Sequence, residues 1–271
     1  MTKLAAVIGD PIAHSRSPRL HGHWVRRYGI DGHYIPLHVR SQHLEETLNL
    51  LPKLGFSGSN VTLPHKEAAF ELAHEATDRA KAVGAANTLT FADGRILADN
   101  TDGSGFTAAL LQSAGPVALS MPTVILGAGG AARGIIAALL DAGVPDIRIA
   151  NRTEERAETL AALFDDRVRS VDWTEPLDGL VDPSLLVNTT SLGMTGHPGL
   201  DIDLNGLLAG SVVSDIVYTP LETPLLAAAR TRGLVAVDGL GMLLHQAVPG
   251  FERWFGIRPE VDDALRRAVL A

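Results

Sequence analysis

Short apolar runs alternate with segments of helical period along most of this chain. The runs LAAVIG (4–9), YIPLHV (34–39) and SNVTL (59–63) have the length of strands. Helices are predicted from an N-cap and first-turn pair at Ser17-Pro18 to about Tyr28, and again over 41–55. Two extended runs flank Asp93-Gly94, which is a two-residue hairpin signal. The first part of the chain is therefore predicted to be α/β with one antiparallel excursion.

A second series of apolar runs begins after Gly103. A helix leads to a strand, a glycine turn and a helix over 122–143, and further strands are predicted at 146–152, 184–190, 211–218 and 234–239. After Gly241 the pattern is helical to the end, and we expect these helices to pack on the first domain or across both. The prediction is an N-terminal α/β substrate domain (1–102 with 240–271) and a Rossmann-type, doubly wound domain (103–239), with a cleft between them.

Composition narrows the class of protein. The 271 residues are 46% hydrophobic and 20% charged, which suits a sizeable core. The formal net charge of -8 argues against a broad basic surface for nucleic acid. The chain has no cysteine, which excludes disulfides, iron–sulfur clusters, thiolate-bound zinc and a thiol nucleophile. No apolar run has the length of a membrane span or of a signal-peptide core, so a soluble cytoplasmic enzyme is expected.

A glycine-rich turn carries the clearest chemical signal. The spacing Gly127-x-Gly129-x-x-Ala132 directly follows an apolar strand and opens a helix. Glycines allow a tight turn there and let the backbone approach a pyrophosphate, while the helix N-terminus offers unpaired N–H groups to the anion. Glycine and alanine also serve tight turns alone, but the strand and helix context favours a dinucleotide site.

The end of the next strand indicates which dinucleotide is bound. NAD-binding proteins usually carry an acidic residue there, whereas this chain has Asn151-Arg152-Thr153 and then Arg156. A guanidinium at Arg152 suits a 2′-phosphate, so NADP is predicted. The alternative is that Thr153 caps the following helix while Arg152 and Arg156 are solvated.

Three polar clusters stand at or just beyond the ends of predicted strands: His14–Ser17, Asn60–Lys66 and Asp99–Asp102. Hydroxyl and amide side chains suit a polyhydroxylated substrate, because they can donate and accept hydrogen bonds. Lys66 and Asp102 are the obvious acid–base pair among them. Each residue also has an explanation without a catalytic role, since Lys66 could be a solvated surface lysine and Asp102 could serve simply as a helix cap.

The chain contains the motifs GDPIAHSRSP, NVTLPHK, GAANT, NTDG, GAGGAAR, NRTEERA, NTTSLGM, DIVYTPLETPLL and DGLGMLLHQA. Their combination resembles the shikimate dehydrogenase family. These motifs run from residue 9 to residue 247, so the resemblance covers nearly the whole chain. It implies interconversion of 3-dehydroshikimate and shikimate with NADPH, in aromatic biosynthesis, with Lys66 and Asp102 as the catalytic pair. The implied substrate site is Ser15, Ser17, Asn60, Thr62, Asn87, Asp102, Tyr218 and Gln246. The implied cofactor site is Gly127, Gly129, Gly130, Ala131, Asn151, Arg152, Thr153, Arg156, Thr189, Gly239 and Met242.

Several alternatives stay open at this point. Ser17 could be only an N-cap, Tyr218 and Met242 ordinary core, and Gln246 a solvated position. A quinate/shikimate dehydrogenase of broader substrate and cofactor use is the nearest alternative enzyme, and a non-catalytic NADP-binding protein is another class. No metal is predicted, because His21 and His23 do not share a helix face. Gly22, where many members carry asparagine, and the variable His197-Pro198 depart from the family pattern. The expected partners are small molecules only, with the chain a monomer or homodimer.

Overall fold

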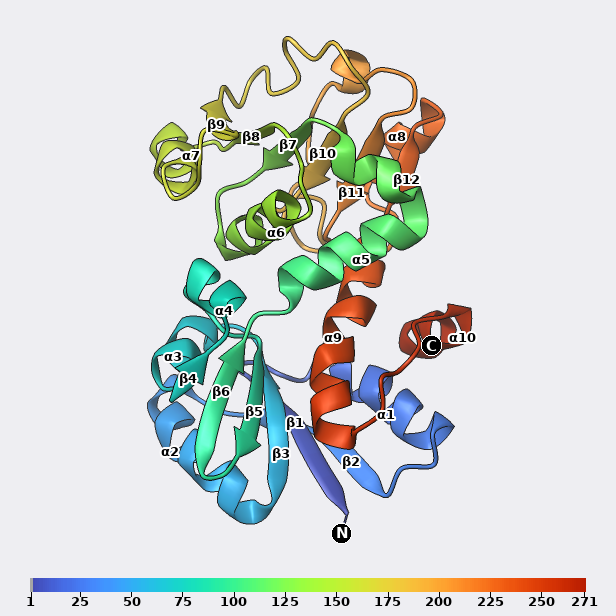
Figure 1. Cartoon of the computed structure of the whole chain (residues 1–271). Coiled ribbons are helices and arrows are strands. Elements are labelled where there is room, and N and C mark those ends of the chain that lie inside the picture. The colour runs from blue at the N-terminus through green and yellow to red at the C-terminus, as the bar shows by residue number, and fades with distance from the viewer. Residues whose placement is uncertain (1) are drawn as a thin grey trace. The chain divides into compact units, whose positions relative to one another are not determined.

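The computed structural model describes residues 2–271 and divides the chain into two compact units (Figure 1). Unit 1 contains the residues up to Asp102 and Leu244–Ala271, and unit 2 is Gly103–Leu243. The first boundary lies where the sequence predicts it, but the second falls after Leu243 instead of after Gly239. The reason is that helix α9 (Gly239–Phe255) runs through the predicted boundary, and its residue Met242 packs against the core of unit 2.

Unit 1 is built on a mixed sheet in the order β2-β1-β3-β5-β6-β4. Its strands are β1 (Lys3–Gly9), β2 (Gly32–His38), β3 (Phe56–Val61), β4 (Glu75–Ala76), β5 (Thr88–Ala92) and β6 (Arg95–Asp99). Its helices are α1 (Ser17–Arg27), α2 (Leu44–Leu50), α3 (Lys66–Glu71), α4 (Asp78–Val83), most of α9, and α10 (Asp263–Leu270). Strand β1 pairs in parallel with β2 and β3, while β5 is antiparallel to both β3 and β6. The predicted hairpin is confirmed, with Asp93 and Gly94 at positive φ of 51° and 71°.

Two details of unit 1 differ from the sequence prediction. The helix predicted over 41–55 is a short α2 between two 3-10 turns, Ser41–His43 and Leu51–Leu54. Pro52 explains the break, because it has no N–H for an α-helical hydrogen bond. Strand β4 was not predicted, since two residues carry no periodic pattern.

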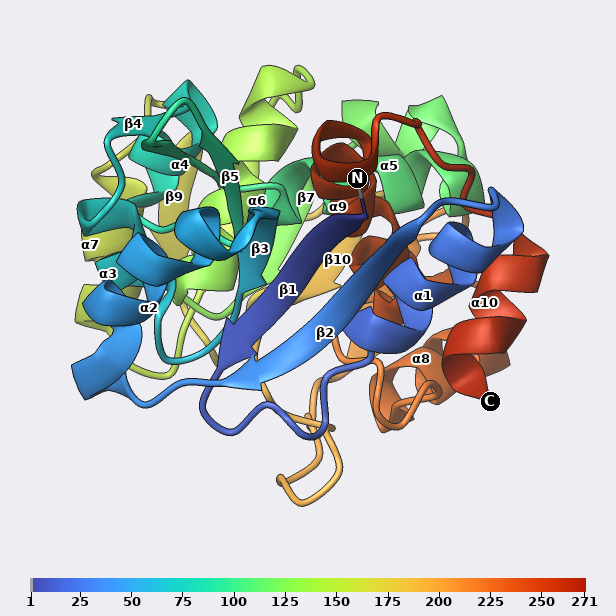
Figure 2. The same cartoon turned by 90° about the horizontal axis from the view of Figure 1, so that it is seen from below.

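The C-terminal helices return to the first sheet, as the sequence suggested. Helix α10 packs beside α1 (Figure 2), where Arg27 forms ion pairs with Glu260 at 3.0 Å and with Asp262 at 2.6 Å. Trp254 of α9 donates a hydrogen bond from its indole nitrogen to the Leu89 carbonyl of β5, at 3.0 Å. A Cβ on Gly58 would lie 1.9 Å from that nitrogen, so only glycine fits at this point of β3.

Unit 2 is a parallel sheet in the order β12-β11-β10-β7-β8-β9. Its strands are β7 (Thr123–Leu126), β8 (Ile147–Ala150), β9 (Val168–Val171), β10 (Leu185–Asn188), β11 (Val212–Asp215) and β12 (Val235–Val237). Its helices are α5 (Asp102–Ala114, whose first residue ends unit 1), α6 (Gly130–Asp141), α7 (Glu154–Ala161), α8 (Pro224–Thr231) and the first turn of α9; Pro116–Ser120 and Leu204–Gly206 are 3-10 turns. This strand order is the doubly wound arrangement that the sequence predicts.

Each face of the second sheet has its own core. Ile125 and Val187 belong to one cluster, whereas Val124, Leu126 and Leu186 belong to the other. Neighbouring side chains of a strand point to opposite faces, so a sheet covered on both faces needs the continuous apolar runs seen in the sequence. Strand β9 (VRSV) lacks such a run, and the sequence did not reveal it.

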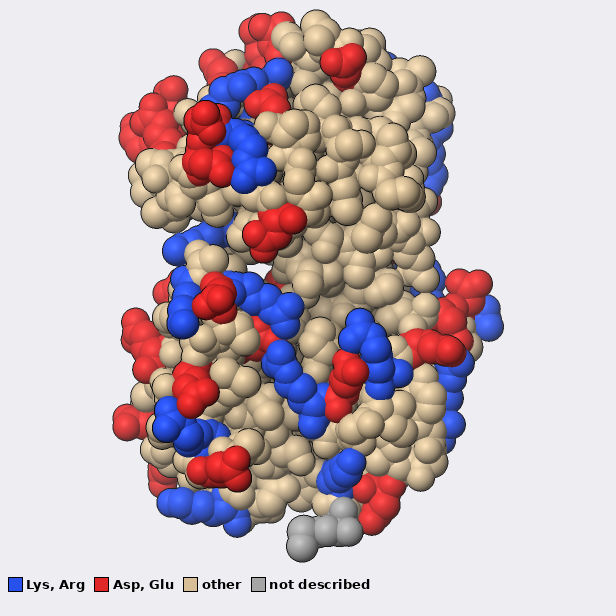
Figure 3. All heavy atoms as spheres, viewed as in Figure 1, with Lys and Arg blue, Asp and Glu red and all other residues tan. Residues whose placement is uncertain are grey.

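Acidic and basic side chains are interspersed on the visible face of each unit, without a broad basic field (Figure 3). Within residues 2–271, no helix combines the length and the apolar character needed to cross a membrane.

Candidate active site

The centre of the unit 1 site is an ion pair between the two predicted catalytic residues. Lys66 Nζ donates to Asp102 Oδ2 at 2.6 Å, and Asn87 Nδ2 donates to Asp102 Oδ1 at 2.7 Å. Both carboxylate oxygens are therefore held. The side chains of Lys66 and Asp102 are 29% and 18% exposed, so the pair is partly shielded from water yet open to a ligand.

Neutral side chains extend this pair into a network. Asn87 Nδ2 also donates to Gln246 Oε1 at 3.3 Å, while Asn87 Oδ1 accepts from the backbone N–H and the hydroxyl of Thr101. Thr88 connects the network to Asn60, because its hydroxyl accepts from Asn60 Nδ2 at 3.1 Å and donates to Asn87 Oδ1 at 3.0 Å. Five predicted site residues are thus brought together, and all of them are in unit 1: Asn60, Lys66, Asn87, Asp102 and Gln246.

The register of the sheet explains why residues distant in sequence meet here. Asn60 pairs with Thr88 across β3 and β5, and Thr88 pairs with Asp99 across β5 and β6. Lys66 is the first residue of α3, and Asp102 is the first residue of α5. The Asp102 carboxylate accepts from Lys66 and Asn87, so it does more than cap α5, and the backbone N–H of Asp102 is bound by the Asn100 side chain at 3.2 Å.

Asp99 anchors the strand that leads to this site. It is completely buried, and it accepts from Arg79 through both oxygens at 2.6 Å, from Thr77 at 2.8 Å and from Arg253 at 2.7 Å. Burial alone would raise the pKa of Asp99, but the hydrogen bonds from Arg79 and Thr77 lower it to about 2. The sequence analysis assigned Asp99 only to a polar cluster, since nothing local reveals its partners.

Ser17 does not cap α1, contrary to that part of the sequence prediction. Arg16 occupies the N-cap position with helical backbone angles and no side-chain cap, which places Ser17 inside the first turn. The Ser17 side chain is instead buried. The Ser15 hydroxyl oxygen accepts from the Ser17 N–H at 3.3 Å.

Thr62 lies just beyond the end of β3, partly buried beside the end of β1. A Cβ on Gly9 would lie 2.5 Å from Thr62 Cγ2, so glycine is required there for the close approach.

In unit 2 the glycine turn leaves a space of the kind a phosphate needs. Gly127 has a positive φ of 108°, and a Cβ on it would lie 2.8 Å from Thr189 Oγ1. Gly129 and Gly130 are exposed, and a Cβ on either would meet nothing within 4 Å. The turn lies between the carboxyl end of β7 and the N-terminus of α6, beside β10, where the strand order reverses. These features fit a dinucleotide pyrophosphate.

The predicted 2′-phosphate residues follow β8. Asn151 Nδ2 donates to the Thr153 carbonyl at 2.7 Å, which shapes the turn. Thr153 takes the N-cap position of α7, but its side chain makes no capping hydrogen bond. Arg152 and Arg156 are exposed, and within residues 2–271 neither guanidinium has an ion-pair or hydrogen-bond partner. Both are available to an anion.

The other predicted residues of unit 2 lie in different local environments. Thr189 donates from its hydroxyl to the Leu126 carbonyl at 2.7 Å. A Cβ on Gly239 would lie 2.2 Å from the Ile216 carbonyl oxygen, which explains glycine there. Ala131 is half-buried in the first turn of α6, Met242 packs partly buried on the core, and Tyr218 is half-buried beyond β11. Tyr218 therefore belongs to a different unit from the other predicted substrate residues.

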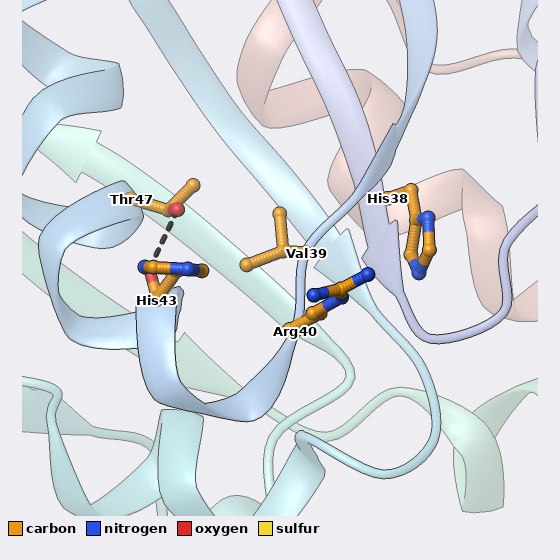
Figure 4. Close-up of a pocket in the computed structure, with 5 residues that line it drawn as sticks. All are labelled: His38, Val39, Arg40, His43 and Thr47. Carbon is orange, nitrogen blue, oxygen red and sulfur yellow. Dashed lines mark hydrogen bonds between the residues drawn. The ribbon is translucent and has the colours of Figure 1, made fainter.

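A pocket of about 300 Å³ lies elsewhere in unit 1, lined by His38, Val39, Arg40, His43 and Thr47 (Figure 4). None of these residues was predicted to be functional. The Val39 carbonyl accepts from the buried His65 ring at 2.6 Å, so His65 carries its proton on Nε2. Among the described residues, no group of three or more His, Asp or Glu side chains is arranged to hold a metal ion.

This chain is similar to known proteins over nearly its whole length. Three family models match: a shikimate dehydrogenase substrate binding domain over 7–89, a shikimate/quinate 5-dehydrogenase over 110–191, and a shikimate 5′-dehydrogenase C-terminal domain over 239–270. A shikimate dehydrogenase (NADP+) from a Ruegeria species is 57% identical over 98% of each chain.

Solved structures are similar over nearly the whole chain. A Thermus thermophilus shikimate 5-dehydrogenase in complex with NADP(H) and shikimate has a TM-score of 0.87 at 35% identity, covering 99% of this chain and 100% of that one. A quinate dehydrogenase from Corynebacterium glutamicum in complex with NAD has a TM-score of 0.90 at 33% identity, covering 99% of both chains.

Proposed function

Because the chain belongs to the shikimate dehydrogenase family, we propose that it catalyses the reversible reduction of 3-dehydroshikimate to shikimate with NADPH. The reaction is an oxidoreduction between a ketone and a secondary alcohol in aromatic biosynthesis. The contact of 2.6 Å between Lys66 Nζ and Asp102 Oδ2 carries the proposal at the level of residues, since it places a cation and a carboxylate among neutral donors and acceptors.

Lys66 acts as the acid in the direction of ketone reduction. Reduction puts negative charge on the carbonyl oxygen, which a nearby ammonium stabilises before it supplies the proton. Of the three N–H bonds of Lys66, one points to Asp102, which leaves two donors for the substrate. In the oxidising direction the pair accepts the hydroxyl proton.

Asp102, Asn60, Asn87 and Gln246 surround the ring hydroxyls of the substrate in this proposal. The support is that their side chains already form one hydrogen-bonded set with Lys66. Thr62 and Tyr218 are proposed as further hydroxyl contacts.

Ser15 and Ser17 bind the substrate carboxylate in this proposal. They lie next to each other at the start of α1, where hydroxyls and helix N–H groups suit an anion. Because Ser17 does not cap α1, loss of its hydroxyl should affect the Michaelis constant more than helix stability.

NADP binds to unit 2 in this proposal. Gly127, Gly129, Gly130 and Ala131 would cradle the pyrophosphate, and Asn151, Arg152, Thr153 and Arg156 would hold the adenosine 2′-phosphate. Thr189, Gly239 and Met242 would lie near the nicotinamide half. The reduced cofactor, when bound, supplies the hydride. The absence of an acid after β8 favours NADP over NAD, even though a quinate dehydrogenase with NAD shares the fold.

A four-way assay tests the proposed function. NADPH oxidation is followed with 3-dehydroshikimate and with 3-dehydroquinate, and each ketone is also tried with NADH. We expect the highest kcat/KM for 3-dehydroshikimate with NADPH. Equal use of 3-dehydroquinate would favour the broader quinate/shikimate enzyme, and binding of NADPH without turnover would favour a non-catalytic binding protein.

The cytoplasmic location and the monomeric or homodimeric state stay predictions. Light scattering on the purified chain would measure the second.

A further inference from the structure

Tyr34 on strand β2 is a buried polar group outside the set of residues described so far. Its side chain is 7% exposed, and its ring stacks on His21 at 3.9 Å with an interplanar angle of 7°. The centroid of the Trp254 ring lies 6.1 Å from that of Tyr34, with an interplanar angle of 33°. Burial lowers the pKa of His21 to about 3, so this stack is neutral at physiological pH. The aromatic ring of Tyr34 is therefore held in one position by its neighbours.

The hydroxyl of Tyr34 contacts one proposed substrate residue. It donates to Asn60 Oδ1 at 2.6 Å, which uses the single hydrogen of the phenol. Burial raises the pKa of Tyr34 well above its usual value, which keeps the phenol protonated.

The contact completes the hydrogen bonding of the Asn60 amide. Its Nδ2 hydrogens go to the Asn87 carbonyl and to Thr88 Oγ1, each at 3.1 Å, while Tyr34 supplies the donor to Oδ1. The Asn87 carbonyl can only accept, so it fixes which end of the amide carries the oxygen. One lone pair on Oδ1 is left to accept from a substrate hydroxyl.

We propose that Tyr34 is a positioning residue of the substrate site, whose hydroxyl fixes the orientation of the Asn60 amide. Asn60 would bind a ring hydroxyl, so this orientation sets how that part of the substrate is held. The inference rests on the proposed function, and it adds a residue that does not touch the substrate.

The test is Tyr34→Phe, which keeps the ring and its stack on His21 and removes only the hydroxyl. We expect the KM for shikimate to rise about tenfold, equivalent to ~1.4 kcal/mol of binding, with kcat changed less than about threefold. The dissociation constant for NADP and the pH profile of shikimate oxidation should not change.

Tyr28→Phe is the matched control. Tyr28 is a tyrosine of the same unit whose hydroxyl oxygen accepts from the Glu260 N–H at 3.0 Å, away from the proposed substrate residues. Its loss should leave the KM for shikimate unchanged, whatever it does to the melting temperature.

A double-mutant cycle shows whether Tyr34 acts through Asn60. In a chain that already carries Asn60→Ala, Tyr34→Phe should change KM less than about twofold, because nothing is left to position. A normal KM in folded Tyr34→Phe, an undiminished effect in that background, or failure of Tyr34→Phe to fold would each overturn the proposal. Wild-type chain that does not oxidise shikimate with NADP would instead refute the proposed function.

Discussion

The two units prepare their ligand sites in opposite ways. In unit 1 the site consists of side chains that bind one another, from Lys66 and Asp102 through Asn87 to Asn60. In unit 2 the site depends on Gly127 and Gly129, which have no side chain to fill the turn, and on the exposed cation Arg152. Donors and acceptors in unit 1 are already oriented, whereas unit 2 presents backbone and open space.

The difference follows from the ligand that each unit is proposed to bind. Ring hydroxyls must be distinguished by position, which needs a rigid pattern of donors and acceptors. A pyrophosphate needs close approach of N–H groups, which any side chain at the turn would block. Substitutions in the unit 1 network should therefore change chemistry or substrate binding, while those at the glycine turn and at Arg152 of unit 2 should change cofactor binding.

The largest expected effect is that of Lys66→Ala in unit 1. Turnover should fall ~10²-fold or more in both directions, because the acid and base of the reaction is lost. The dissociation constants for shikimate and NADP should change far less. Steady-state rates and binding titrations measure both, with Lys81→Ala, an exposed lysine paired to Asp78, as the control. Near-normal turnover would show that Lys66 and Asp102 are not the catalytic pair.

Arg152→Ala should have the next largest effect, confined to unit 2. Loss of a charge-assisted contact to the 2′-phosphate should weaken NADP binding about 10- to 100-fold and barely alter NAD binding. The control is Arg167→Ala, since Arg167 pairs with Asp165 and precedes β9, whereas Arg152 follows the parallel neighbour β8, so the two lie at opposite ends of the strands. Fluorescence titration with both cofactors measures the effect, and equal losses for NADP and NAD would contradict the proposed role.

The stability of unit 1 should depend on pH through Asp99. Its pKa is lowered from 3.8 to about 2 by the fold, so ionised Asp99 stabilises the fold above the unfolded value. This contribution, about 2 kcal/mol, should be lost as the pH falls from about 5 to 2. Urea unfolding should show a smaller dependence on pH in this range for Asp99→Asn, and an unchanged one for the exposed Asp78→Asn. Identical profiles for wild type and Asp99→Asn would rule the effect out.

The smallest expected effect is a difference in stability between substitutions at two glycines of the same turn. Gly129→Ala meets no atom within 4 Å, so stability should fall by at most ~0.5 kcal/mol while NADP binding weakens about tenfold. Gly127→Ala should lower the melting temperature clearly, because of its positive φ and the contact with Thr189. Circular dichroism and NADP titration measure the pair. Equal losses of stability would mean that the turn is not preformed for the cofactor.

Local patterns predicted the parts of this molecule that rest on neighbours in sequence. The Asp93-Gly94 hairpin, the glycine turn and the helix starting near Ser17 follow from such patterns. Strand β9 was missed because VRSV has too few apolar residues, and Ser17 was misplaced because a serine before proline usually caps a helix.

The sequence by itself determined the alternation of strands and helices, the glycine turn and the residue types available for chemistry. Only the tertiary structure decided that Tyr34, Asn60 and Asn87 share one hydrogen-bond network, and that Asp99 is held by Arg79 and Arg253. The physical reason is range: turns and helices depend on dihedral angles and hydrogen bonds a few residues apart, whereas a buried polar network depends on sheet register and on helices that return from the far end of the chain.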